Sequence, residues 1–173
     1  MTGTAKLYFE SGSVFYDSIS ASVPSLYLNG SKFHGVTILE STGSSNVTST
    51  GGCSFYNQMS FENDLSTSAI YSFANAQTDT FLMSSSFTNK GGTFTLNKGL
   101  FYGKCSIDNK AASVGEGFYI SSTGTCTFKD SLYFIEINSP GVRFGSSGGI
   151  TVLDSNSTFV TEISTGGILF MQN

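Results

Sequence analysis

The chain has 173 residues, of which only 12% are charged, and it contains 16 Phe, 20 Gly, 30 Ser and 19 Thr but no Trp and a single His. Helix-favouring charged residues are scarce and apolar residues do not recur at helical spacing, which excludes a helical or α/β protein. The net charge of −4 and only eight scattered basic residues argue against nucleic acid and against insertion into or binding to an anionic membrane. The length suits one domain.

A short sequence motif, called a phrase below, recurs seven times, which predicts a fold built from repeats. Successive phrases start 18 to 27 residues apart, the length of one coil of a three-sided solenoid, and six of the seven begin with Phe. In chain order the phrases are Phe15-Tyr-Asp, Phe33-His-Gly, Phe55-Tyr-Asn, Phe81-Leu-Met, Phe101-Tyr-Gly, Phe128-Lys-Asp and Val152-Leu-Asp. Stacking the coils places their first residues in one column, so we predict a phenylalanine ladder in the core.

Other columns follow from the same alignment. The third residue of the phrase is Asp, Asn or Gly in six of seven copies, which predicts a corner: Asp17, Gly35, Asn57, Met83, Gly103, Asp130 and Asp154. Four residues later a mainly apolar column predicts the second side: Ala21, Leu39, Phe61, Phe87, Ile107, Phe134 and Thr158. Two residues before the ladder a mostly small column is predicted: Ser13, Ser31, Cys53, Asp79, Gly99, Cys126 and Ile150.

Short apolar segments predict the third side of each coil. They are Leu26-Tyr-Leu, Ile70-Tyr-Ser, Phe94-Thr-Leu, Phe118-Tyr-Ile, Val142-Arg-Phe and Ile168-Leu-Phe. Glycines at 51–52, 91–92, 115, 117, 141, 148–149 and 166–167 are interpreted as a second corner. We therefore predict an all-β, single-domain parallel β-helix over residues 1–173, of about seven coils with three short strands each. Parallel crossovers are almost always right-handed, so right-handed coils are expected.

The three cysteines, Cys53, Cys105 and Cys126, are interpreted as small core residues. Their odd number and the lack of CxxC spacing predict neither a disulfide framework nor a zinc site. Cys53 and Cys126 would also lie three coils apart, too far to bond. No metal and no cofactor is predicted.

The segment from Cys105 to Ile120, CSIDNKAASVGEGFYI, resembles the repeats of polymorphic-membrane-protein-like and related pectin-lyase-like β-helices. Weaker similarity lies in Phe87-Thr-Asn-Lys-Gly-Gly-Thr-Phe and in the Gly-Gly-Ile pieces at 148–150 and 166–168. Repeats of this family form extracellular and adhesive rods, so the resemblance implies an extracellular or cell-surface location. The first residues, Met1-Thr-Gly-Thr-Ala-Lys6, are not expected to form a signal peptide.

Pectin-lyase-like enzymes generally use clustered carboxylates, and the candidate here is the corner pair Asp130 and Asp154. The alignment stacks these residues on neighbouring coils about 5 Å apart, with Lys129 and Arg143 nearby. A polysaccharide-active lyase or hydrolase is therefore the alternative function. Against it, Asp is a common corner residue, and Asp17 holds the same column without a partner.

The residue after each ladder position should face solvent, and this column contains Tyr16, His34, Tyr56, Leu82, Tyr102, Lys129 and Leu153. Such a stripe suits stacking on sugars or packing against a partner chain, although aromatic residues favour strand surfaces in any case. We single out Tyr16, His34, Tyr56 and Tyr102 as binding candidates.

Both ends of the chain are apolar, with Lys6-Leu-Tyr-Phe9 near the start and Ile168-Leu-Phe-Met-Gln-Asn173 at the end. We therefore expect a piece of a longer rod or a protomer that stacks end to end. The function predicted first is a non-enzymatic structural or adhesive rod that acts by surface binding, by end-to-end assembly or by both. Its expected partners are copies of itself or adjoining coils, with carbohydrate or a surface protein as alternatives.

Overall fold

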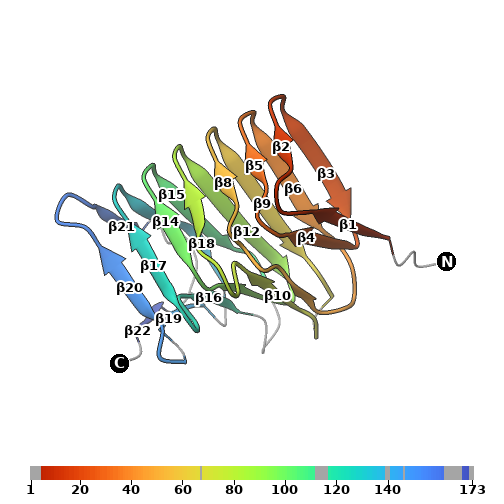
Figure 1. Cartoon of the computed structure of the whole chain (residues 1–173). Helices are drawn as coiled ribbons and strands as arrows, with labels where there is room; N and C mark the ends of the chain where they lie inside the picture. Colours follow the sequence, from red (N-terminus) through yellow and green to blue (C-terminus); the bar gives the residue numbers. More distant parts are fainter. Residues whose placement is uncertain are drawn as a thin grey trace.

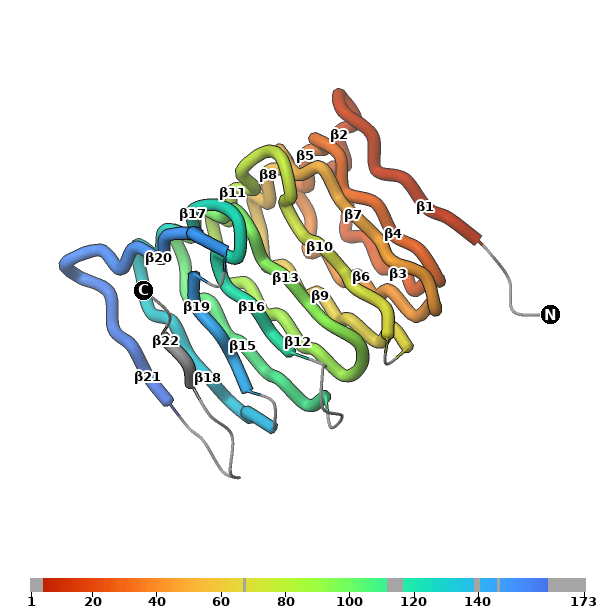
Figure 2. Tube along the Cα trace, turned by 90° about the horizontal axis from the view of Figure 1, so that it is seen from below, coloured from red at the N-terminus to blue at the C-terminus, as the bar shows by residue number. Residues whose placement is uncertain are grey.

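The computed structural model describes residues 5–66, 68–111, 117–138, 141–145, 147–161 and the backbone of 169–171. These residues form strands and turns and contain no helix. The strands are arranged as a stack of three-sided coils that runs from the N-terminal to the C-terminal end (Figures 1 and 2). The predicted fold class, an all-β parallel β-helix, is confirmed.

Three columns of strands run along the rod, and within each column every strand pairs in parallel with its neighbours. The ladder sheet consists of β2 (Val14–Phe15), β5 (Lys32–Phe33), β8 (Ser54–Phe55), β11 (Asp79–Phe81), β14 (Gly99–Phe101), β17 (Thr125–Phe128) and β20 (Ile150–Leu153). The broad sheet consists of β3 (Ile19–Val23), β6 (Thr37–Ser41), β9 (Met59–Asp64), β12 (Ser85–Gly91), β15 (Cys105–Asn109), β18 (Leu132–Ile137) and β21 (Phe159–Thr161).

The third sheet consists of β7 (Val47–Thr48), β10 (Ile70–Phe73), β13 (Thr93–Leu96), β16 (Phe118–Ile120), β19 (Val142–Phe144) and β22 (Leu169–Met171). The pair β1 (Lys6–Phe9) and β4 (Ser25–Leu28) lies at the N-terminal end of this same side. The N–H of Gly51, in the turn after β7, donates to the carbonyl of Leu28 at 3.0 Å. The third side was predicted except for β1 and the two-residue β7; Ile168, expected to begin the last strand, lies outside the described residues.

The phenylalanine ladder is present over six coils. Neighbouring rings from Phe15 to Phe128 lie 4.5 to 5.3 Å apart with interplanar angles of 1° to 13°. The rings from Phe33 onward are buried, while Phe15 at the end of the stack is half-buried. Each buried ring removes apolar surface from water worth about 2 kcal/mol or more, and stacking adds about 0.5 to 1.5 kcal/mol per pair.

The register of the last coil differs from the prediction by one residue. Leu153, not Val152, lies opposite Phe128, and Thr151, not Ile150, lies opposite Cys126. Both Val152 and Leu153 are apolar, so composition alone does not decide which one points inward. On the broad sheet Thr161, not Thr158, lies opposite Phe134, because the loop between β20 and β21 is longer than the loop between β17 and β18.

The glycines interpreted as one corner are divided between two. Gly92 and Gly141 lie between the broad and third sheets, whereas Gly51, Gly52 and Gly148 lie between the third and ladder sheets. All five have positive φ, which explains the glycine at each position. Both corners need the left-handed conformation, so a glycine pattern cannot distinguish them. Positions 115 and 166–167 lie outside the described residues.

A ladder of buried asparagines, which the sequence analysis did not predict, lies at the end of the broad sheet. Asn63 Nδ2 donates to Asn89 Oδ1 at 2.7 Å, and Asn89 Nδ2 donates to Asn109 Oδ1 at 3.0 Å. The same amides also donate to the carbonyls of Gly91, Gly92 and Gly141 in the adjoining corners. The ladder thus satisfies backbone carbonyls where the chain leaves the sheet. The sequence pattern that could have predicted this ladder is an Asn two residues after an apolar residue that points inward, as in Phe61-Glu-Asn63.

Candidate functional site

The outward column beside the phenylalanine ladder is held in position by the ladder's own backbone. From His34 onward, each of its N–H groups donates to the carbonyl of the ladder residue one coil earlier, starting with His34 to Phe15 at 2.7 Å and ending with Asp154 to Phe128 at 2.9 Å. By this pattern the last member is Asp154, not Leu153 as predicted. We define the outer stripe as Tyr16, His34, Tyr56, Leu82, Tyr102, Lys129 and Asp154.

Three of the predicted binding residues form one aromatic stack. The ring centroids of Tyr16 and His34 are 5.1 Å apart at 15°, and those of His34 and Tyr56 are 4.3 Å apart at 5°. Both faces of the His34 ring are therefore covered by tyrosines. A sugar ring therefore cannot stack on a face of His34, although the sequence suggests such stacking for this column.

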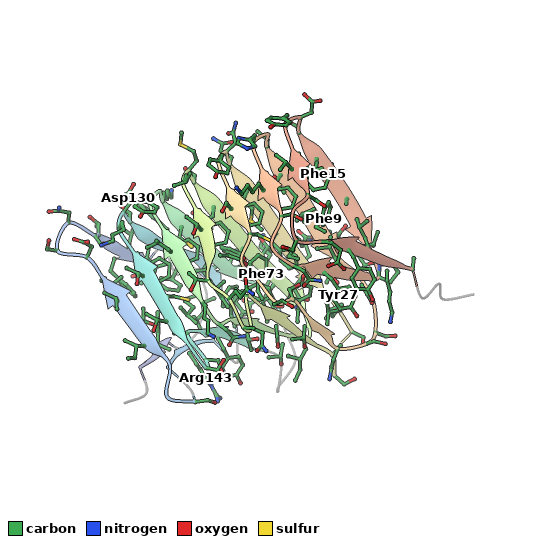
Figure 3. The ribbon with its side chains drawn as sticks, viewed as in Figure 1. Phe9, Phe15, Tyr27, Phe73, Asp130 and Arg143 are labelled. Atoms are coloured by element: carbon green, nitrogen blue, oxygen red, sulfur yellow. The ribbon has the colours of Figure 1, made fainter. Side chains whose placement is uncertain are left out.

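The outer stripe is part of a larger exposed apolar surface. Tyr16 is 75% exposed and Tyr102 is 49% exposed. Among the described residues, nine of the fourteen large hydrophobic residues that are exposed lie on the ladder sheet or the corner that follows it. Eight of them are Val14, Tyr16, Tyr56, Leu82, Met83, Tyr102, Ile150 and Val152. The ninth, Leu153, is in the inward register of the ladder and is exposed in the last coil. Figure 3 shows Phe15 and Asp130 far apart along this edge of the rod, so the surface extends over most of its length.

The two carboxylates predicted as a pair, Asp130 and Asp154, each contact a different neighbouring group. Asp154 lies beside Lys129, and Lys129 Nζ is 2.7 Å from Asp154 Oδ2. The hydrogen bond from Lys129 lowers the pKa of Asp154 below its usual range, and the same contact raises the pKa of Lys129. Asp130 Oδ1 instead accepts from the N–H and hydroxyl of Ser131, at 2.6 and 2.9 Å. The predicted stacking of Asp130 on Asp154 assumed that Val152 continues the ladder. Because Leu153 lies opposite Phe128 instead, the alignment of Asp154 changes by one residue and brings it beside Lys129.

Arg143, expected near these carboxylates, lies on β19 in the third sheet. Its guanidinium carbon is 5.6 Å from the centre of the Tyr119 ring. Asp130 follows the ladder sheet, and Figure 3 places the two residues toward different edges of the rod. Arg143 therefore does not join Asp130 at that corner of the rod.

One carboxyl group is buried in the core. Asp79 lies in the small column, where its Oδ1 accepts from the backbone N–H of Cys53 at 2.7 Å. Its Oδ2 has no hydrogen-bond partner within the described part of the chain. Burial raises the pKa of the Asp79 carboxyl to about 8, so the neutral acid is the main form at neutral pH. The sequence signal was a single acidic residue in a column of small ones.

The three cysteines are buried and unpaired, as predicted. Burial raises the pKa of Cys53 to about 12 and that of Cys126 to about 11. Desolvation also raises the pKa of Cys105. The thiols therefore remain protonated, and neutral buried thiols are poor nucleophiles and poor metal ligands.

Within the described ranges, no three His, Cys, Asp or Glu side chains come together as a metal site. No helix in those ranges is long and apolar enough to cross a membrane. No protein-family model, no curated protein and no solved structure matches the chain.

Proposed function

We propose that the chain is a non-enzymatic structural or adhesive β-solenoid rod whose outer stripe packs against a protein partner, in the first place a second copy of the chain. The observation that carries this proposal is the exposed apolar surface along the ladder sheet and its following corner. Monomeric proteins rarely expose extended apolar surface without using it for interaction. The resemblance of residues 105–120 to adhesive β-helix repeats supports the same role at a cell surface.

The aromatic stack is suited to protein contacts because it is ordered before a partner arrives. The rings of Tyr16 and Tyr56 are stacked against His34, so binding would cost them little side-chain entropy. Tyrosine also combines an apolar ring with a hydroxyl that can donate or accept a hydrogen bond, which is why it is frequent in interfaces. The edges of these three stacked rings fit a flat protein surface better than they fit the face of a single sugar ring.

The last coil supports assembly along the rod axis. Leu153 occupies the register of the ladder and Phe159 lies opposite the buried Leu132, yet the two side chains are 43% and 37% exposed. In the other coils, residues at these inward-facing positions are covered by the following coil. Another copy stacked on this end would cover them and would remove their apolar surface from water.

The test is a triple variant, Tyr16→Ser with Tyr56→Ser and Tyr102→Ser, studied by sedimentation velocity and electron microscopy over a range of concentrations. We expect the wild-type chain to form larger species as its concentration rises and the triple variant to shift toward monomer. The matched control replaces three exposed isoleucines on the other two sheets, Ile38, Ile70 and Ile135, by Ser. This control should assemble like the wild type.

Two results would contradict the proposal. The first is a wild-type chain that stays monomeric at every concentration. The second is depolymerisation of a polysaccharide by the wild-type chain that disappears in Asp130→Asn or Asp154→Asn, since this would establish the enzymatic alternative.

A further inference from the structure

A hollow lies at the corner between the broad and third sheets, over the first coils of the rod. Its origin is a difference in corner length. One residue, Pro24, joins β3 to β4, whereas five residues join β6 to β7 and five join β9 to β10. The wider loops leave a space of about 810 Å³ beside β4. Small-ligand sites commonly measure about 300 to 1,000 Å³, so this hollow is large enough for one.

The backbone holds the loops around the hollow in place. The N–H of Thr42 donates to the carbonyl of Val23 at 3.0 Å, and the N–H of Ser66 donates to the carbonyl of Gly43 at 2.9 Å. Each loop is thus bonded to the corner of the coil before it. The walls of the hollow are built from consecutive coils, so its shape is set by the solenoid.

An aromatic ring and an amide line the hollow. Tyr27 stacks on Tyr8 at 4.4 Å and 8°, and Tyr8 is not a lining residue. One face of the Tyr27 ring is therefore covered, and the remaining part of the ring is available to the hollow. Asn46 Oδ1 accepts from the N–H of Ile70 at 2.9 Å, which orients the side chain and leaves its NH₂ group to donate to a ligand.

The lining also carries one positive and one negative charge. Lys6 and Asp64 are both exposed and both line the hollow. Neither belongs to an ion pair within the described part of the chain. Since the two charges cancel, the hollow favours no net charge on a ligand. The ammonium donates hydrogen bonds and the carboxylate accepts them, and the hydroxyls of Ser44, Ser45 and Ser66 do both.

We propose that this hollow binds a short neutral oligosaccharide. Sugar hydroxyls both donate and accept, so they match the mixture of Asp64, Lys6, Asn46 and serine hydroxyls. The C–H face of a pyranose matches the apolar part of the Tyr27 ring. The hollow lies at a different corner from the outer stripe, as the separation of Tyr27 from Phe15 in Figure 3 indicates. It is therefore independent of the proposed assembly through the stripe.

The test uses the full chain with three neutral probes, cellotriose, chitotriose and maltotriose. Binding is detected by saturation-transfer NMR and measured by titration calorimetry. We expect at least one probe to bind, with contacts concentrated on one or two sugar rings. Asp64→Asn and Lys6→Gln should each weaken that affinity about tenfold or more, the loss expected for a hydrogen bond to a charged group.

The matched controls are Asp17→Asn and Lys32→Gln, which change exposed charges away from the hollow. They should bind the probe like the wild type, and circular dichroism should show the same fold for all four variants. The proposal is overturned if no probe binds, or if Asp64→Asn and Lys6→Gln bind as tightly as the wild type. It is also overturned if a trigalacturonate or triglycine probe binds more tightly than the neutral sugars.

Discussion

Two aromatic columns run side by side along this rod, one inside and one outside. They are adjacent in sequence, since Phe33 precedes His34 and Phe55 precedes Tyr56. Their ring spacings are also alike: Phe33 and Phe55 are 4.9 Å apart, and His34 and Tyr56 are 4.3 Å apart. The ladder rings are buried, whereas Tyr56 is 37% exposed. The coil repeat therefore sets the stacking geometry, and burial decides whether a stack stabilises the fold or remains available to a partner.

The same contrast applies to polar groups. Outside, Lys129 and Asp154 form an ion pair in contact with water, and such pairs contribute little to stability. Inside, Asn89 and Asp79 are fully buried, so their hydrogen bonds and protonation states should matter much more. The predictions that follow test this difference between interior and surface.

The largest effect on stability is expected from ionisation of the buried Asp79 carboxyl. Its pKa rises from an ordinary value of 3.8 to about 8 on folding. Its contribution to stability is therefore fully present below about pH 4 and is lost as the pH rises to about 8, by at most about 6 kcal/mol. Urea unfolding across this range should show the decrease, and Asp79→Asn should flatten it. The buried Cys53, Cys126 and Tyr71 titrate only above this window.

Asp130→Asn is the matched surface control, because its carboxyl is exposed at a corner. This variant should retain the wild-type decrease between pH 4 and 8. If Asp79→Asn also retained it, another group would have to cause the pH dependence.

Phe101→Ala should cost about 3 to 5 kcal/mol, because it opens a cavity in the middle of the stacked core. Phe15→Ala should cost less, since Phe15 is half-buried at the end of the ladder. Chemical denaturation with a common slope measures both values. Equal losses at the two positions would show that the ladder does not act as a cooperative stack.

Asn89→Ala should cost about 1 to 3 kcal/mol. It removes the acceptor for Asn63 and leaves Asn109 Oδ1 and the Gly92 carbonyl without their donor. The control is Thr88→Ala on the outward face of the same strand, which should change stability by less than about 0.5 kcal/mol. If Asn89→Ala and Thr88→Ala caused equally small losses of stability, water would have to replace the hydrogen bonds of the missing Asn89 amide.

Tyr102→Ser should have the smallest effect on folding, within about 0.5 kcal/mol, although Tyr102 is the neighbour of Phe101. Its effect should appear in the assembly measured by sedimentation velocity. A loss of stability close to that of Phe101→Ala would remove the distinction between the inner and outer columns.

Much of this architecture is predictable from the sequence because it repeats. The repeated motif predicts the ladder from Phe15 to Phe128, since each coil must present the same kind of residue at the same place. The prediction was wrong in the last coil, where Val152 and Leu153 are both apolar and alternation does not choose between them. The same one-residue difference moved Asp154 from Asp130 to Lys129. A repeat pattern is therefore least informative where neighbouring residues are alike.

The sequence by itself determined the fold class, the inner ladder and the buried positions of the cysteines, because these depend on residue type at a regular spacing. The tertiary structure alone decided which groups meet across coils. It linked Asn63, Asn89 and Asn109 through their amides, covered both faces of His34, and separated Asp130 from Arg143. It also opened the hollow beside Tyr27. These features depend on corner lengths and on hydrogen bonds between residues a coil apart, which no local pattern specifies.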